Sequence, residues 1–220
     1  MTDTKIRPDT HEMVIVHRAF RREFRLAPEL IAQAAAGDTA RVKVVAEHVA
    51  DIVWGLHHHH HGEDELLWPK LIQRAKPDVE LIELMEAQHV HISAALDGAE
   101  ALIGPWRTSA DPEAGAALAT AIEAMSAALA EHLDQEEAQI LPLAEQHLSV
   151  AEWQQLGKNA VDNLPKSKRL IFLGMILEDT SDEERAEFLR NIPPPVRVLW
   201  RLLGVRGYQK YVAKVRGYGR

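Results

Sequence analysis

The chain of 220 residues contains no cysteine. This absence excludes disulfide bonds, thiolate zinc sites, iron–sulfur clusters and thiol nucleophiles. Aromatic residues make up only 5% of the sequence, and the abundance of alanine and leucine favours helices over sheets. Uncharged apolar runs such as residues 170–177 are far shorter than the ~20 residues that a membrane span requires. The opening residues MTDTKIRPDTHE lack the apolar core of a secretory signal, so we expect a cytoplasmic protein.

Charge is distributed unevenly along the chain. The formal net charge is −8, yet residues 196–220 contain seven basic residues and no acidic one, so the remainder carries about −15. An acidic body argues against nucleic acid as the main partner. The basic segment is amphipathic, which favours packing against the acidic body and leaves a membrane surface or a nucleic acid as alternatives. Its basic residues are Arg197, Arg201, Arg206, Lys210, Lys214, Arg216 and Arg220.

Two amphipathic segments open the chain. Apolar residues at helical spacing predict a first helix over about residues 9–36, with a kink or break at Pro28. Asp38 offers an N-cap for a second helix that runs through a series of histidines. Pro69 predicts a kink near the end of this second helix, because proline lacks the backbone donor that the helix needs.

Two further amphipathic segments follow. Pro77 predicts the start of the third helix and Pro105 its end, with residues 106–112 as a loop. Asp111 is a good N-cap for the fourth helix, which carries Pro142 near its end. Long amphipathic helices joined by short connections are typical of an antiparallel bundle.

The predicted fold class is therefore all-α. Residues 1–150 are expected to form an antiparallel up-down-up-down four-helix bundle, and residues 151–220 a basic extension of shorter helices that packs on or near it.

Histidine is unusually frequent, and some of the histidines belong to an internal repeat. The chain has twelve histidines, five of them consecutive at residues 57–61. The second half of the predicted bundle repeats the first, because a histidine, a glutamate and a proline of the first half each recur the same number of residues later. A further histidine recurs after a separation that is one residue shorter. The matched pairs are His59 and His132, Glu63 and Glu136, Pro69 and Pro142, and His17 and His89.

This repeat predicts a metal site. Each hairpin supplies one histidine from its first helix and an H-x-x-x-E pair from its second, and residues four apart lie on one helix face. Buried carboxylates cost several kcal/mol unless they are paired or coordinated, and two divalent cations would neutralise them. Nitrogen and oxygen donors without thiolate favour iron or manganese over copper or structural zinc. The predicted ligands are His17, His59, Glu63, His89, His132 and Glu136.

The histidine run allows another register. His61 and Glu65 form an equally spaced pair, but the repeat selects His59, because His59 and His132 each stand ten residues before a proline. Isolated histidines elsewhere are interpreted as surface or satisfied core residues, namely His11, His48 and His147.

These motifs resemble the hemerythrin-like family, whose members are also called HHE cation-binding domains. The similar stretches are VHRAFRREF, HHHGEDELLWP, MEAQH and HLDQEEAQILP, and the resemblance covers about residues 9–148. The resemblance implies that the six predicted ligands hold two Fe ions in an oxo- or hydroxo-bridged di-iron centre, with manganese or zinc as substitutes.

One position departs from the oxygen-carrying members of that family. They have a second histidine four residues after the third-helix ligand, where this chain has Ser93. Two six-coordinate irons offer twelve positions, of which four imidazoles, two bridging carboxylates and a bridging oxygen fill all but two. Two open positions favour turnover of hydrogen peroxide, dioxygen or nitric oxide over reversible carriage of dioxygen. His58, His60 or a water could fill a vacancy.

Three functions are compatible with these features. The first is a catalase-like di-iron protein that disproportionates peroxide, with Glu137, Glu65 or Glu86 as proton shuttles. The second is a sensor, storage protein or carrier that binds iron or dioxygen without turnover. The third is a helical scaffold whose histidines bind metal adventitiously.

Overall fold

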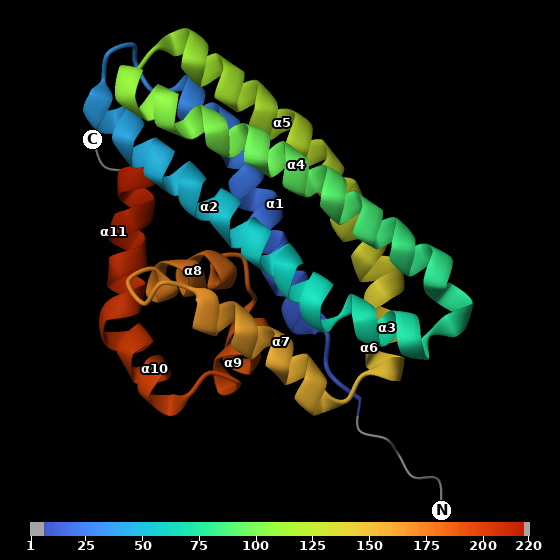
Figure 1. Ribbon diagram of the computed structural model, residues 1–220. Helices are drawn as coiled ribbons and strands as arrows, with labels where there is room; N and C mark the ends of the chain where they lie inside the picture. Colours follow the sequence, from blue (N-terminus) through green and yellow to red (C-terminus); the bar gives the residue numbers. More distant parts are fainter. Residues whose placement is uncertain (1–6, 218–220) are drawn as a thin grey trace, which may run out of the picture.

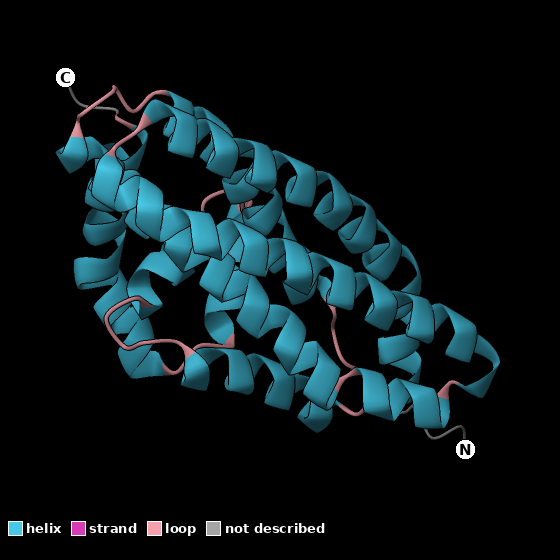
Figure 2. Cartoon of the chain, turned by 45° about the horizontal axis from the view of Figure 1, so that its top comes forward, coloured by secondary structure: helices cyan, strands magenta, loops and turns pink. Residues whose placement is uncertain are grey.

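The body of the molecule is a bundle of long helices. The computed structural model describes residues 7–217, and within this range every regular element is a helix (Figure 2), which confirms the all-α prediction. Helix α1 packs against α2 and α5, and α4 packs against the same two helices, so the four lie side by side (Figure 1). Their bounds are His11–Ala32 for α1, Thr39–Leu66 for α2, Val79–Ser109 for α4 and Pro112–Gln135 for α5.

Shorter helices extend one end of the bundle and form the C-terminal region. Those at the end of the bundle are α3 (Trp68–Arg74), the 3-10 turn η1 (Lys76–Asp78), the π-helical turn η2 (Glu136–Ile140) and α6 (Leu141–His147). The C-terminal region comprises α7 (Val150–Asn163), α8 (Arg169–Leu177), α9 (Asp182–Arg190), α10 (Pro194–Leu199), the π-helical turn η3 (Trp200–Gly204) and α11 (Val205–Arg216).

Prolines do not interrupt the helices uniformly. Pro28 lies inside α1 without ending it. The predicted end at Pro105 and the predicted loop over residues 106–112 were wrong, because α4 continues past this proline to Ser109. Ile103 and Trp106, on either side of it, are both buried. Their packing outweighs the loss of one backbone hydrogen bond.

The prolines that end the two repeated motifs act differently. Helix α2 ends at Leu66 and Pro69 lies in the first turn of α3, so the predicted kink is a break between two helices. Before Pro142, the chain instead widens into the π-helical turn η2, which starts at Glu136. Asp111 caps α5 as predicted, since its carboxylate accepts a hydrogen bond from the Ala114 amide.

A polar layer divides the core. One apolar cluster fills the end of the bundle around Phe24, Leu56 and Leu129, and a second fills the other end around Met13 and Met85. On each long helix the predicted metal ligands fall between residues of one cluster and residues of the other. The bundle therefore encloses its polar groups between two dry layers.

The C-terminal helices pack on one side of the bundle. Helix α7 packs against α2, α8 against α1, and α11 against α2 and α8. Buried charges join the two regions, because Glu23 on α1 lies 2.7 Å from Arg22 and 3.1 Å from Arg216 of α11. His48 Nε2 lies 3.3 Å from the same carboxylate in a geometry that makes no hydrogen bond. Arg220, at the end of the basic segment, lies outside the described residues.

Candidate metal centre

Four helices direct donor atoms to one buried layer. His17 on α1, His59 and Glu63 on α2, and Glu136 after α5 have ligand atoms within 4.8 Å of one another. His17 Nε2 and His59 Nε2 are 3.1 Å apart. The side chains of His17, Glu63 and Glu136 are completely buried.

A second group of donors lies beside the first. His89 on α4 and His132 on α5 bring their Nε2 atoms to 3.0 Å from each other. The ligand atoms of His60, His89 and His132 all lie within 4.8 Å of one another. Two nitrogens that bind one ion at right angles, each about 2.1 Å from it, lie about 3.0 Å apart. Both Nε2 pairs therefore have the spacing of adjacent ligands on one ion.

The two glutamates connect the groups. Glu63 Oε1 lies 3.3 Å from His59 Nε2, while its Oε2 lies 3.6 Å from His89 Nε2. Glu136 Oε2 lies 3.5 Å from His17 Nε2 and 3.7 Å from His132 Nε2. Each carboxylate thus faces one histidine from each hairpin, which is the placement of a bridging ligand.

None of these carboxylate oxygens has a hydrogen-bond partner among the described residues. Both oxygens of Glu63 and both of Glu136 are buried without one. Burial raises the pKa of Glu63 well above its ordinary value, and the Glu136 carboxylate adds to this rise. Burial also lowers the pKa of His132 to about 3 and that of His59 well below its ordinary value. Orphaned carboxylate oxygens beside imidazole nitrogens fit divalent cations, because bound ions would favour the ionised carboxylates and satisfy both sets of lone pairs.

Two further carboxylates orient the histidines on the first helix of each hairpin, which are His17 on α1 and His89 on α4. Asp64 Oδ1 lies 2.7 Å from His89 Nδ1, and Glu137 Oε1 lies 3.0 Å from His17 Nδ1. Each ring therefore donates its Nδ1 proton outward and turns the Nε2 lone pair toward the layer, as metal-bound histidines commonly do. Although burial alone would raise the pKa of Glu137, hydrogen bonds from His17 and Arg21 lower it.

The structure brings the six predicted ligands together. Of the three predicted proton shuttles, it places Glu137 beside a ligand and Glu65 at the surface. Glu137 contacts His17, as described above. Glu65 lies on the solvent side of α2, is 53% exposed, and pairs with His61 at 3.3 Å. Residues four apart share a helix face, so the pair of His61 and Glu65 faces away from the pair of His59 and Glu63.

Asp64 was not predicted from the sequence. A signal was present, because Asp64 and Glu137 are separated by the same offset as Glu63 and Glu136. Trp68 supports Asp64 by donating its indole N–H to the carboxylate at 3.0 Å. Arg21 plays the corresponding part for Glu137, with a contact of 2.6 Å.

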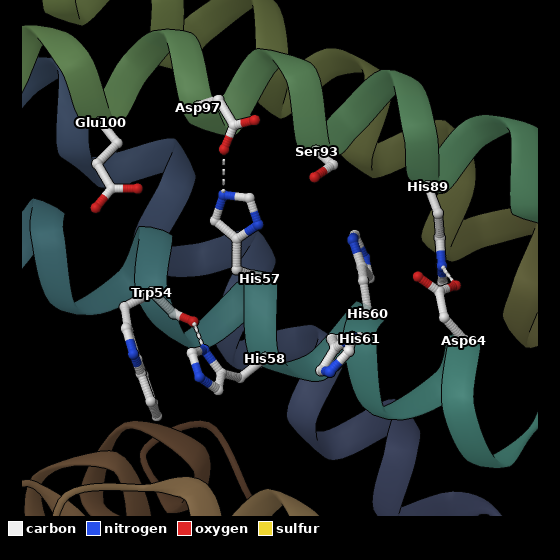
Figure 3. Close-up of a pocket in the computed structure, with 10 residues that line it drawn as sticks. All are labelled: Trp54, His57, His58, His60, His61, Asp64, His89, Ser93, Asp97 and Glu100. Carbon is white, nitrogen blue, oxygen red and sulfur yellow. Dashed lines mark hydrogen bonds and ion pairs between the residues drawn. The ribbon is translucent and has the colours of Figure 1, made fainter.

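A cavity of about 440 Å³ reaches the layer between α2 and α4 (Figure 3). Its outer part carries His57, which lies 3.3 Å from Asp97. Its inner part is lined by His60, His89 and Ser93. This cavity offers a route from solvent to the buried histidines.

Comparison with known proteins gives one match. Residues 9–144 match the family described as hemerythrin HHE cation binding domain. No curated protein and no solved structure matches the chain significantly. The matched segment contains every donor of the buried layer.

Proposed function

Because the chain belongs to the hemerythrin HHE cation-binding family, we propose that its antiparallel up-down-up-down bundle holds two iron ions. The observation that carries this proposal is that all four oxygens of Glu63 and Glu136 are buried without a hydrogen-bond partner among the described residues. Three of these oxygens lie 3.3 to 3.7 Å from imidazole nitrogens. Donors of this kind also suit manganese and zinc, so the metal is identified by elemental analysis together with the optical spectrum.

We further propose that the centre binds a small oxidant and disproportionates hydrogen peroxide. Bound iron supplies Lewis acidity and electrons for such a reaction. The protein supplies the surroundings: Glu63 and Glu136 balance the charge of the ions, and the two apolar clusters exclude bulk water from the layer.

Glu137 is the candidate for proton exchange. Its Oε1 accepts hydrogen bonds from His17 and from Arg21, and its side chain is 23% exposed. It therefore joins the buried layer to solvent through one carboxylate. Glu137→Gln, which keeps an acceptor oxygen but cannot carry the proton, is expected to keep iron and lose turnover.

Oxygen release from peroxide tests the activity. Iron-loaded protein is expected to evolve oxygen at a rate far above that of the double variant His59→Ala/Glu136→Ala, with His61→Ala as the matched control from the same histidine run. Equal rates in the wild type and the double variant would rule out turnover. A release of oxygen that survives in the double variant would point to adventitious iron.

A second function is favoured by one observation. The carboxylates of Glu63 and Glu136 are buried, so loss of the cations would leave them uncompensated and weaken the bundle. A metal-dependent change of order is what an iron sensor requires. Strong protection from protease on iron binding, with no oxygen release from peroxide, would support this reading.

A further inference from the structure

We propose that His60 is a fifth imidazole ligand, which binds the ion held by His89 and His132. This inference rests on the proposed di-iron centre. It assigns to α2 the ligand that oxygen-carrying members take from the third long helix, where this chain has Ser93.

The position of His60 argues for coordination. Its side chain is only 4% exposed, and neither ring nitrogen has a hydrogen-bond partner among residues 7–217. The ring projects from α2 toward α4 and stacks on His89 with centroids 4.2 Å apart (Figure 3). Its centroid lies 5.2 Å from that of His132. His60 therefore presents free nitrogen lone pairs to the same space as two predicted ligands.

Other histidines of the run differ from His60, because their ring nitrogens have polar partners. The ring of His57 lies 3.3 Å from Asp97, and that of His61 lies 3.3 Å from Glu65. His58 donates from Nδ1 to the carbonyl of Trp54. A histidine with only a packing role would be expected to find such a partner, because an unpaired buried polar group is destabilising.

The repeat supplies an internal comparison. The offset that matches His59 with His132 matches His60 with Leu133, which is completely buried in the apolar core. An apolar side chain therefore fits this helix position in the bundle, and packing alone does not require the imidazole. A coordinated ion removes the disadvantage of the two orphaned nitrogens.

Coordination by His60 makes the two ions unequal. With three imidazoles and two carboxylate oxygens, the ion near His89 and His132 has no position left after a bridging oxygen, whereas the ion near His17 and His59 keeps one. This count replaces the two vacancies expected from the sequence. His60 also lines the cavity that reaches the layer, so coordination would hold its ring at the inner end of this cavity.

The test compares iron-loaded His60→Leu with His61→Leu. Leucine is chosen because the matched position tolerates it. X-ray absorption at the iron edge is expected to show scattering from five imidazoles per pair of irons in the wild type and in His61→Leu, and from four in His60→Leu. One iron is also expected to leave His60→Leu at least about 10-fold faster under a chelator, and added imidazole should restore the lost scattering in His60→Gly.

Two results would overturn the inference in distinguishable ways. If the wild type holds two irons and His60→Leu shows the same imidazole scattering and the same rate of iron loss, the role of His60 is refuted while the di-iron centre stands. If the wild type takes up no stoichiometric iron, both fail together.

A different observation supports a second proposal, which concerns the surface of α10, η3 and the start of α11. This segment contacts the protein along a single stripe, formed by Trp200, Gly204 and Tyr208. Its outer side is apolar and open, with Leu202 at 67% exposure and Leu203 at 61%. Residues three and four apart share a helix face, so the exposed apolar side chains form one patch. They are Val198, Leu199, Leu202, Leu203 and Val205.

Unpaired cations surround this patch. No acidic residue occurs between 188 and 220, and none of the four cations nearest the patch forms an ion pair with any residue in the described range. These cations are Arg197, Arg201, Arg206 and Lys210. Leucine and valine flanked by free arginines suit an anionic lipid surface, which accepts apolar side chains and attracts cations at once.

We propose that this patch binds the surface of anionic membranes. The full iron-loaded chain is expected to float with vesicles of phosphatidylserine and phosphatidylcholine but not with vesicles of phosphatidylcholine alone. Leu202→Glu/Leu203→Glu should abolish flotation, while Val90→Glu, at an equally exposed valine on α4, should not. Absence of flotation would overturn the proposal, as would a wild-type dimer in solution that the double variant dissociates, because the patch would then bind a second copy of the chain.

Discussion

The two hairpins of the bundle present the same donors in different surroundings. The first, α1 and α2, supplies His17, His59 and Glu63, and the second, α4 and α5, supplies His89, His132 and Glu136. In each case a carboxylate that follows the ligand glutamate orients a histidine of the other hairpin. The layer therefore has an approximate twofold symmetry that extends beyond the ligands.

The differences lie just outside this shared set. The second hairpin has Leu133 where the first has His60. Arg21 contacts Glu137, while the neutral indole of Trp68 contacts Asp64. In the proposed di-iron centre, the duplicated features are those that both ions would share, and the features found in one hairpin alone would make one ion different from the other.

The largest effect on iron affinity is expected from the two proposed bridging carboxylates. Because the layer is nearly symmetric, substitution of either one should have the same effect. Glu63→Ala and Glu136→Ala should lose iron to the same extent, at least about 100-fold in affinity, because each carboxylate faces histidines of both hairpins. Iron retained after dialysis against a chelator measures this, with the exposed Glu65→Ala as control. If one variant keeps both irons, the hairpins are not equivalent.

His60 and Leu133 occupy matched positions in the two hairpins but differ in polarity, and substitutions there test this difference. In metal-free protein, Leu133→His should lower the free energy of unfolding by about 2–4 kcal/mol, because it buries an imidazole without a partner. His60→Leu should raise it by about 1 kcal/mol, since it removes two orphaned nitrogens. Urea unfolding of the two variants gives both values, and a loss of stability in His60→Leu would show that this ring has a structural role.

Most of the donors in the buried layer could be predicted from the sequence. The repeat between the two hairpins and the four-residue spacing within a helix predict that six donors face one point. The same repeat would have disclosed Asp64 by its match with Glu137. It did not single out His60, which the sequence named only beside His58 and water as able to fill a vacancy, because a position matched by leucine gives no reason to expect a polar contact.

Helix ends were less predictable than the ligand layer. Pro105 has the same local signal as Pro69, yet one lies inside a helix and the other follows a break. Buried residues flank both prolines, Trp106 beside Pro105 and Trp68 beside Pro69, so the outcome depends on the tertiary fold and not on a local pattern.

The orienting carboxylates should have the next largest effect, and a similar one in both hairpins. Asp64→Ala and Glu137→Ala are each expected to lower iron affinity by about 10- to 100-fold, because partners of this kind fix the tautomer and direction of the bound ring. Competition with a chromogenic chelator gives the affinities. A change in only one variant would indicate that only one ion depends on such a partner.

The smallest effect on iron affinity is expected from the partners of the orienting carboxylates, where one hairpin has a charged donor and the other a neutral one. Arg21→Met removes a charged donor to Glu137, and Trp68→Phe removes a neutral donor to Asp64 while keeping most of the buried ring. Charge-assisted hydrogen bonds are roughly twice as strong as neutral ones, but Arg21 is partly exposed and water will replace part of its contact. We expect affinity losses of about 3-fold for Arg21→Met and less for Trp68→Phe, measured by the same chelator competition. The reverse order would mean that Trp68 acts through packing or through its second contact, because its Nε1 also lies 3.3 Å from Nδ1 of His89.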